Sequence, residues 1–192
     1  MFSFKSVLYM YFNMFIIAGT TYALLLGLLT LVSTGPAFNI ITVLQAGIFF
    51  GAFMSMVCVT AHLLAIVLRR YPVSAETLGV AHARQIKITM PYSDTYNACL
   101  SSIRAIRGGH IVLADRDRGY IKARIPVNLL SFGEEIQLNI HDDDDGASQV
   151  DIYGHPVIRW TLLDYGKNLE NVEKICGFLH GRNKVPTSQI YG

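Results

Sequence analysis

The first 72 residues of this chain contain no aspartate or glutamate and only three basic residues, Lys5, Arg69 and Arg70. About a quarter of the residues in a soluble domain are charged, so this part is not an ordinary soluble sequence. Residues 73–192 hold the other 13 of the 16 basic residues and all 14 acidic ones, and are close to neutral. The positive charge of the whole chain therefore comes from its apolar part and is not the footprint of nucleic-acid binding.

Motifs of catalysis and metal binding are also missing. The sequence contains no HExxH, no G-x-S-x-G and no Walker loop, and Cys58, Cys99 and Cys176 stand apart without a CxxC pair. Unpaired cysteines suit a reducing compartment. The acidic run at residues 142–145 lacks the ligand spacing of a calcium loop. It is expected to be a solvated hairpin tip, with a weak cation or basic-partner contact as the alternative. We expect no enzyme, no cofactor and no metal site.

Two long apolar runs cover residues 7–32 and 40–68, and neither contains a charged residue. About 20 apolar residues cross a bilayer as a helix, so each run is long enough to span one. The first run is too long for the apolar part of a signal peptide. The short loop between them contains Gly35-Pro36. The sequence therefore predicts a transmembrane helical hairpin over residues 1–72.

The few basic residues predict the orientation of this hairpin. They precede the first span and follow the second, and the loop between the spans has none, so both termini are expected in the cytoplasm. This predicts a multi-pass protein of the bacterial inner (plasma) membrane, in contact with lipid. The expected anchors at the membrane interface are Tyr9, Tyr11, Arg69, Arg70 and Tyr71.

Small residues recur at every fourth position in both spans, which lets helices approach closely in lipid. Either the two stripes pack on one another within the hairpin, or one of them faces another subunit. The stripes are Gly19, Ala23 and Gly27 in the first span and Gly47, Gly51 and Ser55 in the second. His62 lies only seven residues before Arg69, so we expect a hydrated or hydrogen-bonded position near the headgroups.

After a connector at 73–84, alternating and helical patterns predict a cytosolic domain over residues 85–181 and a loose tail at 182–192. The expected order is β-α-β-β-β-β-α, an α+β domain with a curved antiparallel sheet. Ser93 is the expected N-cap of the first helix of this domain. The expected elements are strands at 86–90, 110–114, 120–125, 135–141 and 148–153 and helices beginning after 93 and at 169–180.

The segment Asp164-Tyr-Gly-Lys-Asn168, followed by Val172 and Ile175, resembles the D-x-G-x-N ending of an uncharacterised bacterial domain-of-unknown-function family. The hairpin at residues 118–123 is similar to that family as well, and residues 154–163 depart from its tighter connection. The order of elements also resembles a shortened helix-grip (START-like) domain. The resemblance implies this fold and implies no catalytic residues.

Residues 154–163 contain the only tryptophan of the chain, Trp160, next to Arg159. Trp160 and Leu162 either plug the open face of the sheet or contact a membrane or another subunit, surfaces where Trp and Arg are enriched.

These patterns predict a non-enzymatic membrane protein that is a subunit, assembly factor or regulatory factor of a larger membrane complex, or a homo-oligomer. One alternative is a membrane-tethered protein that binds a lipid or another apolar ligand. Another is a homo-oligomeric channel lined by Gly47, Gly51 and Ser55.

Overall fold

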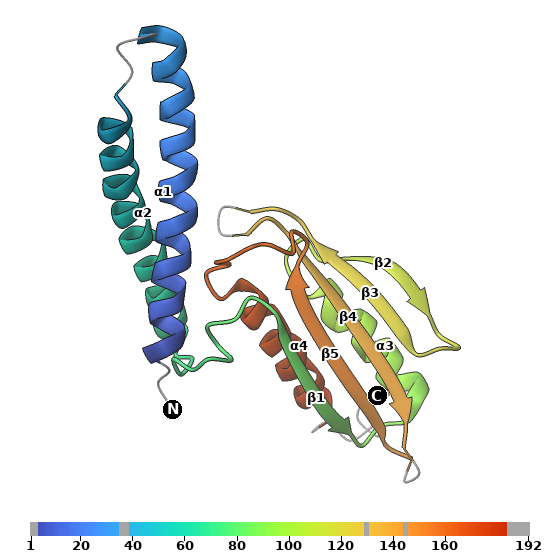
Figure 1. Ribbon diagram of the computed structural model, residues 1–192. Helices are drawn as coiled ribbons and strands as arrows, with labels where there is room; N and C mark the ends of the chain where they lie inside the picture. Colours follow the sequence, from blue (N-terminus) through green and yellow to red (C-terminus); the bar gives the residue numbers. More distant parts are fainter. Residues whose placement is uncertain (1–3, 35–38, 129–130, 144–145, 184–192) are drawn as a thin grey trace. The chain divides into compact units, whose positions relative to one another are not determined.

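The computed structural model describes residues 4–34, 39–128, 131–143 and 146–183. The chain forms two compact units, Met1–Leu78 and Gly79–Gly192. The first unit is helical and the second is an α+β domain (Figure 1).

The first unit consists of the antiparallel helices α1 (Phe4–Thr34) and α2 (Ile40–Leu68). The second helix has the predicted bounds, and the first is longer than predicted at both ends. Asn39 caps α2, because its side-chain oxygen accepts a hydrogen bond from the backbone N–H of Ile41 at 3.0 Å. The predicted turn at Gly35-Pro36 lies outside the described residues.

Both helices are long and apolar enough to span a membrane. Only 6% and 28% of their most apolar windows are buried, whereas a core helix of a soluble protein is buried over most of its surface.

The connector predicted at 73–84 is shorter in the structure. Leu78 is buried against Val7 and Ile66, so this segment belongs to the helical unit. The Thr77 hydroxyl accepts a hydrogen bond from the backbone N–H of Ser74 at 2.9 Å and donates one to the carbonyl of Pro72. The α+β domain accordingly begins before residue 85, and its first strand starts at His82.

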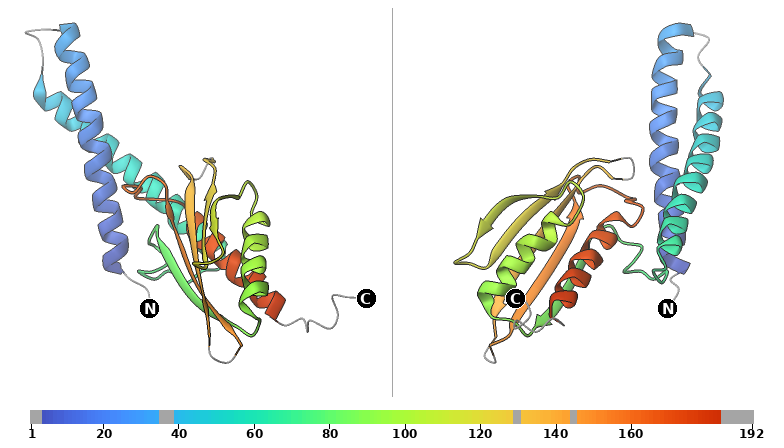
Figure 2. Two further views of the ribbon diagram at one scale, coloured as in Figure 1. Left: turned by 90° about the vertical axis from the view of Figure 1, so that its right-hand side faces the viewer. Right: turned by 180° about the vertical axis from the view of Figure 1, so that it is seen from behind.

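The second unit has the predicted order of elements. Its five strands form one antiparallel sheet in the order β1-β5-β4-β3-β2, and two helices cover one face of it (Figure 2). The elements are β1 (His82–Ile88), α3 (Tyr92–Arg104), β2 (His110–Asp115), β3 (Tyr120–Ile125), β4 (Glu134–Asp142), β5 (Ser148–Pro156) and α4 (Lys167–Asn183). Because β1 and β2 are the two edge strands, α3 crosses the sheet between them.

Two predicted helix ends are wrong. Pro91, not Ser93, is the N-cap of α3, and the Pro91 carbonyl accepts the N–H groups of Asp94 and Thr95 at 3.0 Å. Proline suits this position because its missing N–H is not needed at a helix start. The last helix, predicted over residues 169–180, does not end before Gly181, because α4 continues to Asn183.

The core of the domain lies between the sheet and the two helices. Alternate residues of β1, β3, β4 and β5 point into it, as the period of two in a strand requires. Gly154 allows α4 to come close, because a Cβ there would lie 2.8 Å from Cγ2 of Val172. The completely buried members of this core include Ile88, Cys99, Ile121, Ala123, Ile136, Leu138, Val150, Val172, Ile175 and Leu179.

Candidate functional site

The two stripes of small residues meet in the seam between α1 and α2. A Cβ on Gly47 would lie 2.8 Å from Cβ of Ala23 and 2.9 Å from the carbonyl oxygen of Gly19. A Cβ on Gly51 would lie 2.6 Å from the carbonyl oxygen of Phe15. The backbones therefore approach as closely as glycine permits, and the structure places the stripes inside one hairpin.

The other buried residues of α2 lie on the same face of the helix as Gly47 and Gly51. Ser55 is buried and donates a hydrogen bond to the carbonyl of Ala52, and Gly27 of α1 faces Val43. His62 is also completely buried. Of the two expected environments, hydrated or hydrogen-bonded, burial therefore excludes the hydrated one. The face that carries Gly47, Gly51 and Ser55 is turned towards α1 within the hairpin.

The five expected interface residues lie at the end of the hairpin where the chain leaves α2. Tyr9 is exposed, whereas the Tyr11 hydroxyl is 2.8 Å from the Thr60 hydroxyl on the other helix. Tyr71 packs against the cluster around Val7. Arg69 is the C-cap of α2 and its Nη1 donates to the carbonyl of Ala65 at 3.0 Å, and Arg70 has a positive φ of 62°.

The D-x-G-x-N segment is a structural element at the start of α4. The carboxylate of Asp164 accepts hydrogen bonds from the N–H groups of Gly166 at 3.0 Å and Asn168 at 2.9 Å. Tyr165 and Gly166 both have positive φ, which explains the glycine. The Asn168 amide then donates to the carbonyl of Val80 at 3.0 Å. The motif thus caps a helix and ties it to the segment that precedes β1.

A buried polar pair lies beside this cap. Glu134 and Asn171 are both completely buried, and the Asn171 amide donates to Oε2 of Glu134 at 3.2 Å. Burial raises the pKa of Glu134. Within the described part of the chain, Oε1 of Glu134 and Oδ1 of Asn171 have no hydrogen-bond partner. Sequence reasoning missed both residues, because Glu134 opens a strand and Asn171 lies within a helix, positions that give no sign of burial.

Asn171 also lines a groove of about 720 Å³ on the domain. The groove runs between the end of α3, the segment after β3 and the exposed side of α4. Its walls include the apolar Ile106, Ile125, Pro126 and Val127 and the basic Arg107, Lys167 and Lys174. Burial acts to raise the pKa of Glu170, but hydrogen bonds from Lys174 and Lys167 outweigh it and lower that pKa to about 2. This carboxylate therefore balances part of the basic charge of the groove, that of Lys167 and Lys174.

The outer face of the sheet carries a second polar group, centred on Glu135. Its carboxylate lies 2.8 Å from Nζ of Lys122, 3.7 Å from Arg124 and 3.5 Å from His155. Burial acts to raise the pKa of Glu135, and the hydrogen bonds from Lys122 and Gln137 more than offset it, so the pKa is lowered. One carboxylate thus interacts with two cations, Lys122 and Arg124, and lies beside the His155 ring.

Trp160 is 85% exposed, so it does not plug the sheet. Arg159 is exposed as well. They lie in the segment that joins β5 to α4, and this segment is tied to the β3–β4 connection because the N–H of Val157 donates to the carbonyl of Gly133 at 3.0 Å. The β3–β4 connection has its own exposed apolar side chains, Val127 and Phe132. Neither of these two residues stood out in the sequence.

Among the described residues, no group of three or more His, Cys, Asp and Glu side chains could hold a metal ion. In the acidic hairpin, Asp143 forms an ion pair with Lys87 at 2.6 Å, and residues 144–145 lie outside the described part. Burial raises the pKa of the Cys99 thiol to about 12 and that of Cys176 to about 11, so both thiols are protonated and unreactive.

No family model matches this chain, and no curated protein matches it. Among solved structures, the chain is similar to the crystal structure of Ara h 8.0201, with 11% sequence identity and a TM-score of 0.34. The similarity covers 53% of this chain and 99% of that chain. The fold assignment rests on the strand order and the two helices described above, and the family resemblance of the D-x-G-x-N segment stays a prediction.

Proposed function

We propose that this protein is a non-enzymatic, membrane-anchored accessory protein, in which the hairpin of α1 and α2 spans a bilayer and the α+β domain works at its surface. In this role it is a subunit, assembly factor or regulatory factor of a larger membrane complex. The observation that supports the proposal is the inverted character of the hairpin, whose small residues lie inside and whose large apolar residues lie outside.

The exposed side chains of the hairpin are those that a lipid environment favours. Leu24 is 74% exposed, Phe49 is 75% exposed and Leu68 is 73% exposed. In water such a surface would be unfavourable, because each exposed apolar side chain costs about 1.5–3 kcal/mol relative to a buried one. In lipid this cost disappears, and close packing of glycines holds the helices together.

The connection between the units supports a role at the membrane surface. Only residues 79–81 separate Leu78, buried in the helical unit, from His82 of β1. The four steps from Leu78 to His82, at no more than about 3.6 Å each, reach about 14 Å. A domain on so short a link stays at the membrane whichever way it turns. By the distribution of Lys5, Arg69 and Arg70, this is the cytoplasmic side of a bacterial plasma membrane.

Membrane insertion is tested by alkaline carbonate extraction and flotation of the expressed full-length chain. The chain is expected in the membrane pellet and in the floating fraction. Release into the carbonate supernatant would contradict the proposal.

Topology is tested by thiol labelling with a membrane-impermeant maleimide. The native Cys99 is unsuitable because it is buried, so the labelled positions are Gly177→Cys, which has open space around its Cβ, and Ser33→Cys, which is exposed at the end of α1. In intact cells only Ser33→Cys is expected to react. Reaction of Gly177→Cys there would contradict a cytoplasmic domain.

A second candidate function is ligand binding in the groove beside α4. It is favoured by Asn171, a buried side chain in the wall of the groove whose Oδ1 has no partner among the described residues. A bound molecule with a hydroxyl or amine group would satisfy this acceptor. Mass spectrometry of molecules extracted from the purified protein tests this function, and Asn171→Leu, which removes the acceptor, is the matched control.

A further inference from the structure

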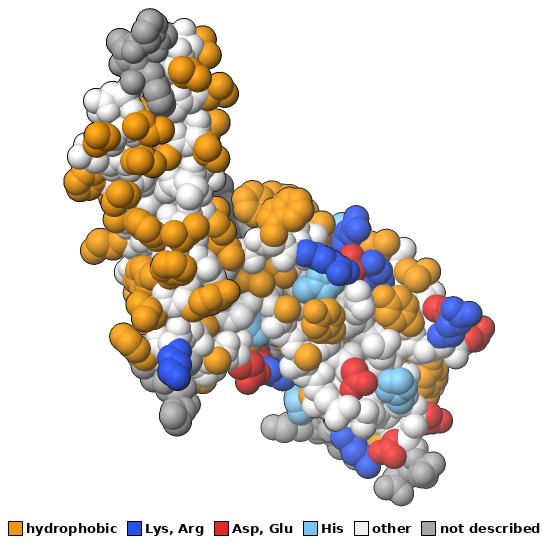
Figure 3. Space-filling view, viewed as in Figure 1, with side chains coloured by type: hydrophobic (Ala, Val, Ile, Leu, Met, Phe, Trp, Pro, Cys, Tyr) orange, Lys and Arg blue, Asp and Glu red, His pale blue; other side chains and the backbone are white. Residues whose placement is uncertain are grey.

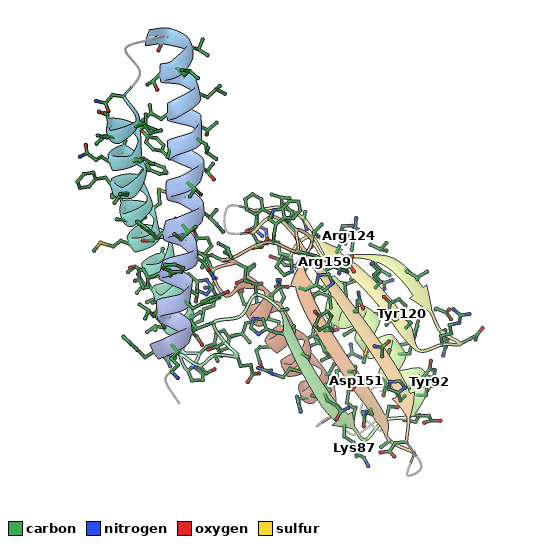
Figure 4. All side chains as sticks on the ribbon, viewed as in Figure 1. Lys87, Tyr92, Tyr120, Arg124, Asp151 and Arg159 are labelled. Atoms are coloured by element: carbon green, nitrogen blue, oxygen red, sulfur yellow. The ribbon has the colours of Figure 1, made fainter. Side chains whose placement is uncertain are left out.

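The end of the sheet where β3 and β5 finish carries an exposed patch of mixed character. We call it the aromatic–arginine patch and define it as Val127, Phe132, Val157, Trp160, Arg124 and Arg159. Figure 3 shows apolar side chains gathered beside basic ones at this end of the domain. Figure 4 shows Arg124 and Arg159 at the same end, far from Lys87 at the other end of the sheet.

The apolar members of the patch project from the fold instead of completing its core. Trp160 is 85% exposed, Val127 is 68% exposed and Phe132 is 62% exposed. They come from two connections that the hydrogen bond from Val157 to Gly133 holds side by side. Large apolar side chains exposed together in this way mark an interaction surface.

The charge of the patch favours an anionic partner. Arg124 and Arg159 are both exposed, and Lys122 lies next to Arg124 on the outer face of the sheet. Among the described residues, the carboxylate that pairs with these cations is that of Glu135, which interacts with Lys122 and Arg124. One carboxylate does not balance three cations, so the surface has an excess of positive charge.

We infer that the aromatic–arginine patch docks the domain onto the anionic headgroups of the bilayer that holds the hairpin. Tryptophan prefers the headgroup level of a membrane, where its ring is buried and its N–H remains hydrated. Arginines beside it meet the negative surface potential of the cytoplasmic leaflet. This inference rests on the proposed membrane anchor, and it adds that the domain itself lies on the lipid surface.

The short link makes such docking effective. A tethered site meets its surface at an effective concentration of about millimolar, so even a weak contact is occupied. The same patch on a free domain would bind lipid far less. The hairpin therefore supplies the anchoring and the patch supplies the orientation of the domain.

Because Trp160 is the only tryptophan of the chain, its fluorescence reports on the patch alone. The full-length chain is reconstituted into vesicles of phosphatidylcholine and phosphatidylglycerol that contain lipids brominated near the headgroup end of the acyl chains. The bromolipids are expected to quench Trp160 about two-fold or more, and aqueous iodide is expected to quench it little. With phosphatidylcholine alone, quenching by bromolipid is expected to fall.

Two variants make the measurement specific. Arg124→Glu with Arg159→Glu is expected to abolish bromolipid quenching and restore quenching by iodide, while the vesicles still carry the protein on flotation. Lys87→Trp in a Trp160→Phe background places the reporter at the opposite end of the sheet, on β1. That tryptophan is expected to respond to iodide and not to bromolipid.

The outcomes separate the two proposals. A chain that does not float with vesicles overturns both the anchor and the docking. A chain that floats, but whose Trp160 is quenched by iodide and not by bromolipid, overturns the docking alone. Shielding of Trp160 from both quenchers, growing with the protein-to-lipid ratio, assigns the patch to a contact between copies of the chain and also overturns the inference.

Discussion

The two units of this chain place large and small side chains in opposite ways. In the hairpin, Gly47 and Gly51 lie inside the seam and Leu24 and Phe49 face outward. In the α+β domain, large aliphatic residues such as Leu138 fill the interior, and charged groups occupy the outer face of the sheet. If the hairpin lies in a bilayer, as proposed, the surrounding solvent explains this difference. A domain in water is stabilised by burial of apolar surface, and helices in lipid are stabilised by close backbone contact.

The sharpest test of this comparison is removal of a large aliphatic side chain from each unit. Leu138→Ala is expected to lower the free energy of unfolding of the domain by about 2–5 kcal/mol, because Leu138 is completely buried. Leu28→Ala in α1, where the side chain is 63% exposed, is expected to change the stability of the hairpin by less than about 0.5 kcal/mol. Urea titration in mild detergent measures both effects, with thiol labelling of Cys99 as the readout for the domain and of Cys58 as the readout for the hairpin. Equal effects would break the comparison.

The reverse substitution tests the hairpin. Gly47→Leu is expected to cost about 1–3 kcal/mol of helix packing, because its Cβ has no room against Ala23 and Gly19. The rate of disulfide formation between Gly27→Cys and Val43→Cys, in a Cys58→Ser background, reports whether the helices stay together. Gly47→Leu is expected to lower this rate several-fold. Ala52→Leu, at an exposed position of α2, is the matched control and is expected to leave the rate unchanged. An unchanged rate for Gly47→Leu would show that the seam is not as tight as described.

The cap of α4 is expected to give a smaller effect. Asp164→Ala removes the acceptor of the N–H groups of Gly166 and Asn168 and is expected to destabilise the domain by about 0.5–2 kcal/mol. Asp117→Ala, at an exposed turn position, is the control. The same urea titration compares the free energies of unfolding of the two variants. Equal stability of Asp164→Ala and the unchanged chain would indicate that the D-x-G-x-N segment has a role other than capping.

The smallest effect is expected at Glu134. Its pKa is raised by burial, so the penalty for its charge is absent at low pH and is fully present once the pH exceeds the raised pKa. Glu134→Gln is therefore expected to stabilise the domain by about 1 kcal/mol at neutral pH, because the amide has no charge to bury. The gain should disappear as the pH falls below 4.5, the ordinary pKa of this side chain. Thermal unfolding of Glu134→Gln and of the unchanged chain at several pH values measures this difference in stability. A stability gain that persists in acid would exclude the charge of the Glu134 carboxylate as its cause.

Much of the fold follows from local patterns. The absence of charge between residues 40 and 68 predicts α2 with its observed bounds, and alternation in the second unit predicts the strands in their observed order. These patterns are readable because each is repeated over many residues and depends only on the period of a helix or a strand. Element ends were predicted less well, as at Pro91, because a cap depends on a few contacts.

The candidate sites were much less predictable. The sequence shows two stripes of small residues but not whether they face one another, and it shows Trp160 but not that Phe132 and Val127 are exposed on the adjoining connection. Those facts depend on pairs of residues far apart in the chain, such as Val157 and Gly133. No local pattern contains such a pair.

Composition and periodicity are properties of the chain alone, so the amino-acid sequence is enough to predict the two apolar helices, the α+β class of the second unit and the lack of known catalytic motifs. The packed molecule was needed to show that the glycines lie inside the hairpin, that Glu134 and Asn171 are buried together and that Trp160 is exposed. Burial and proximity arise only when segments that are far apart in the chain meet.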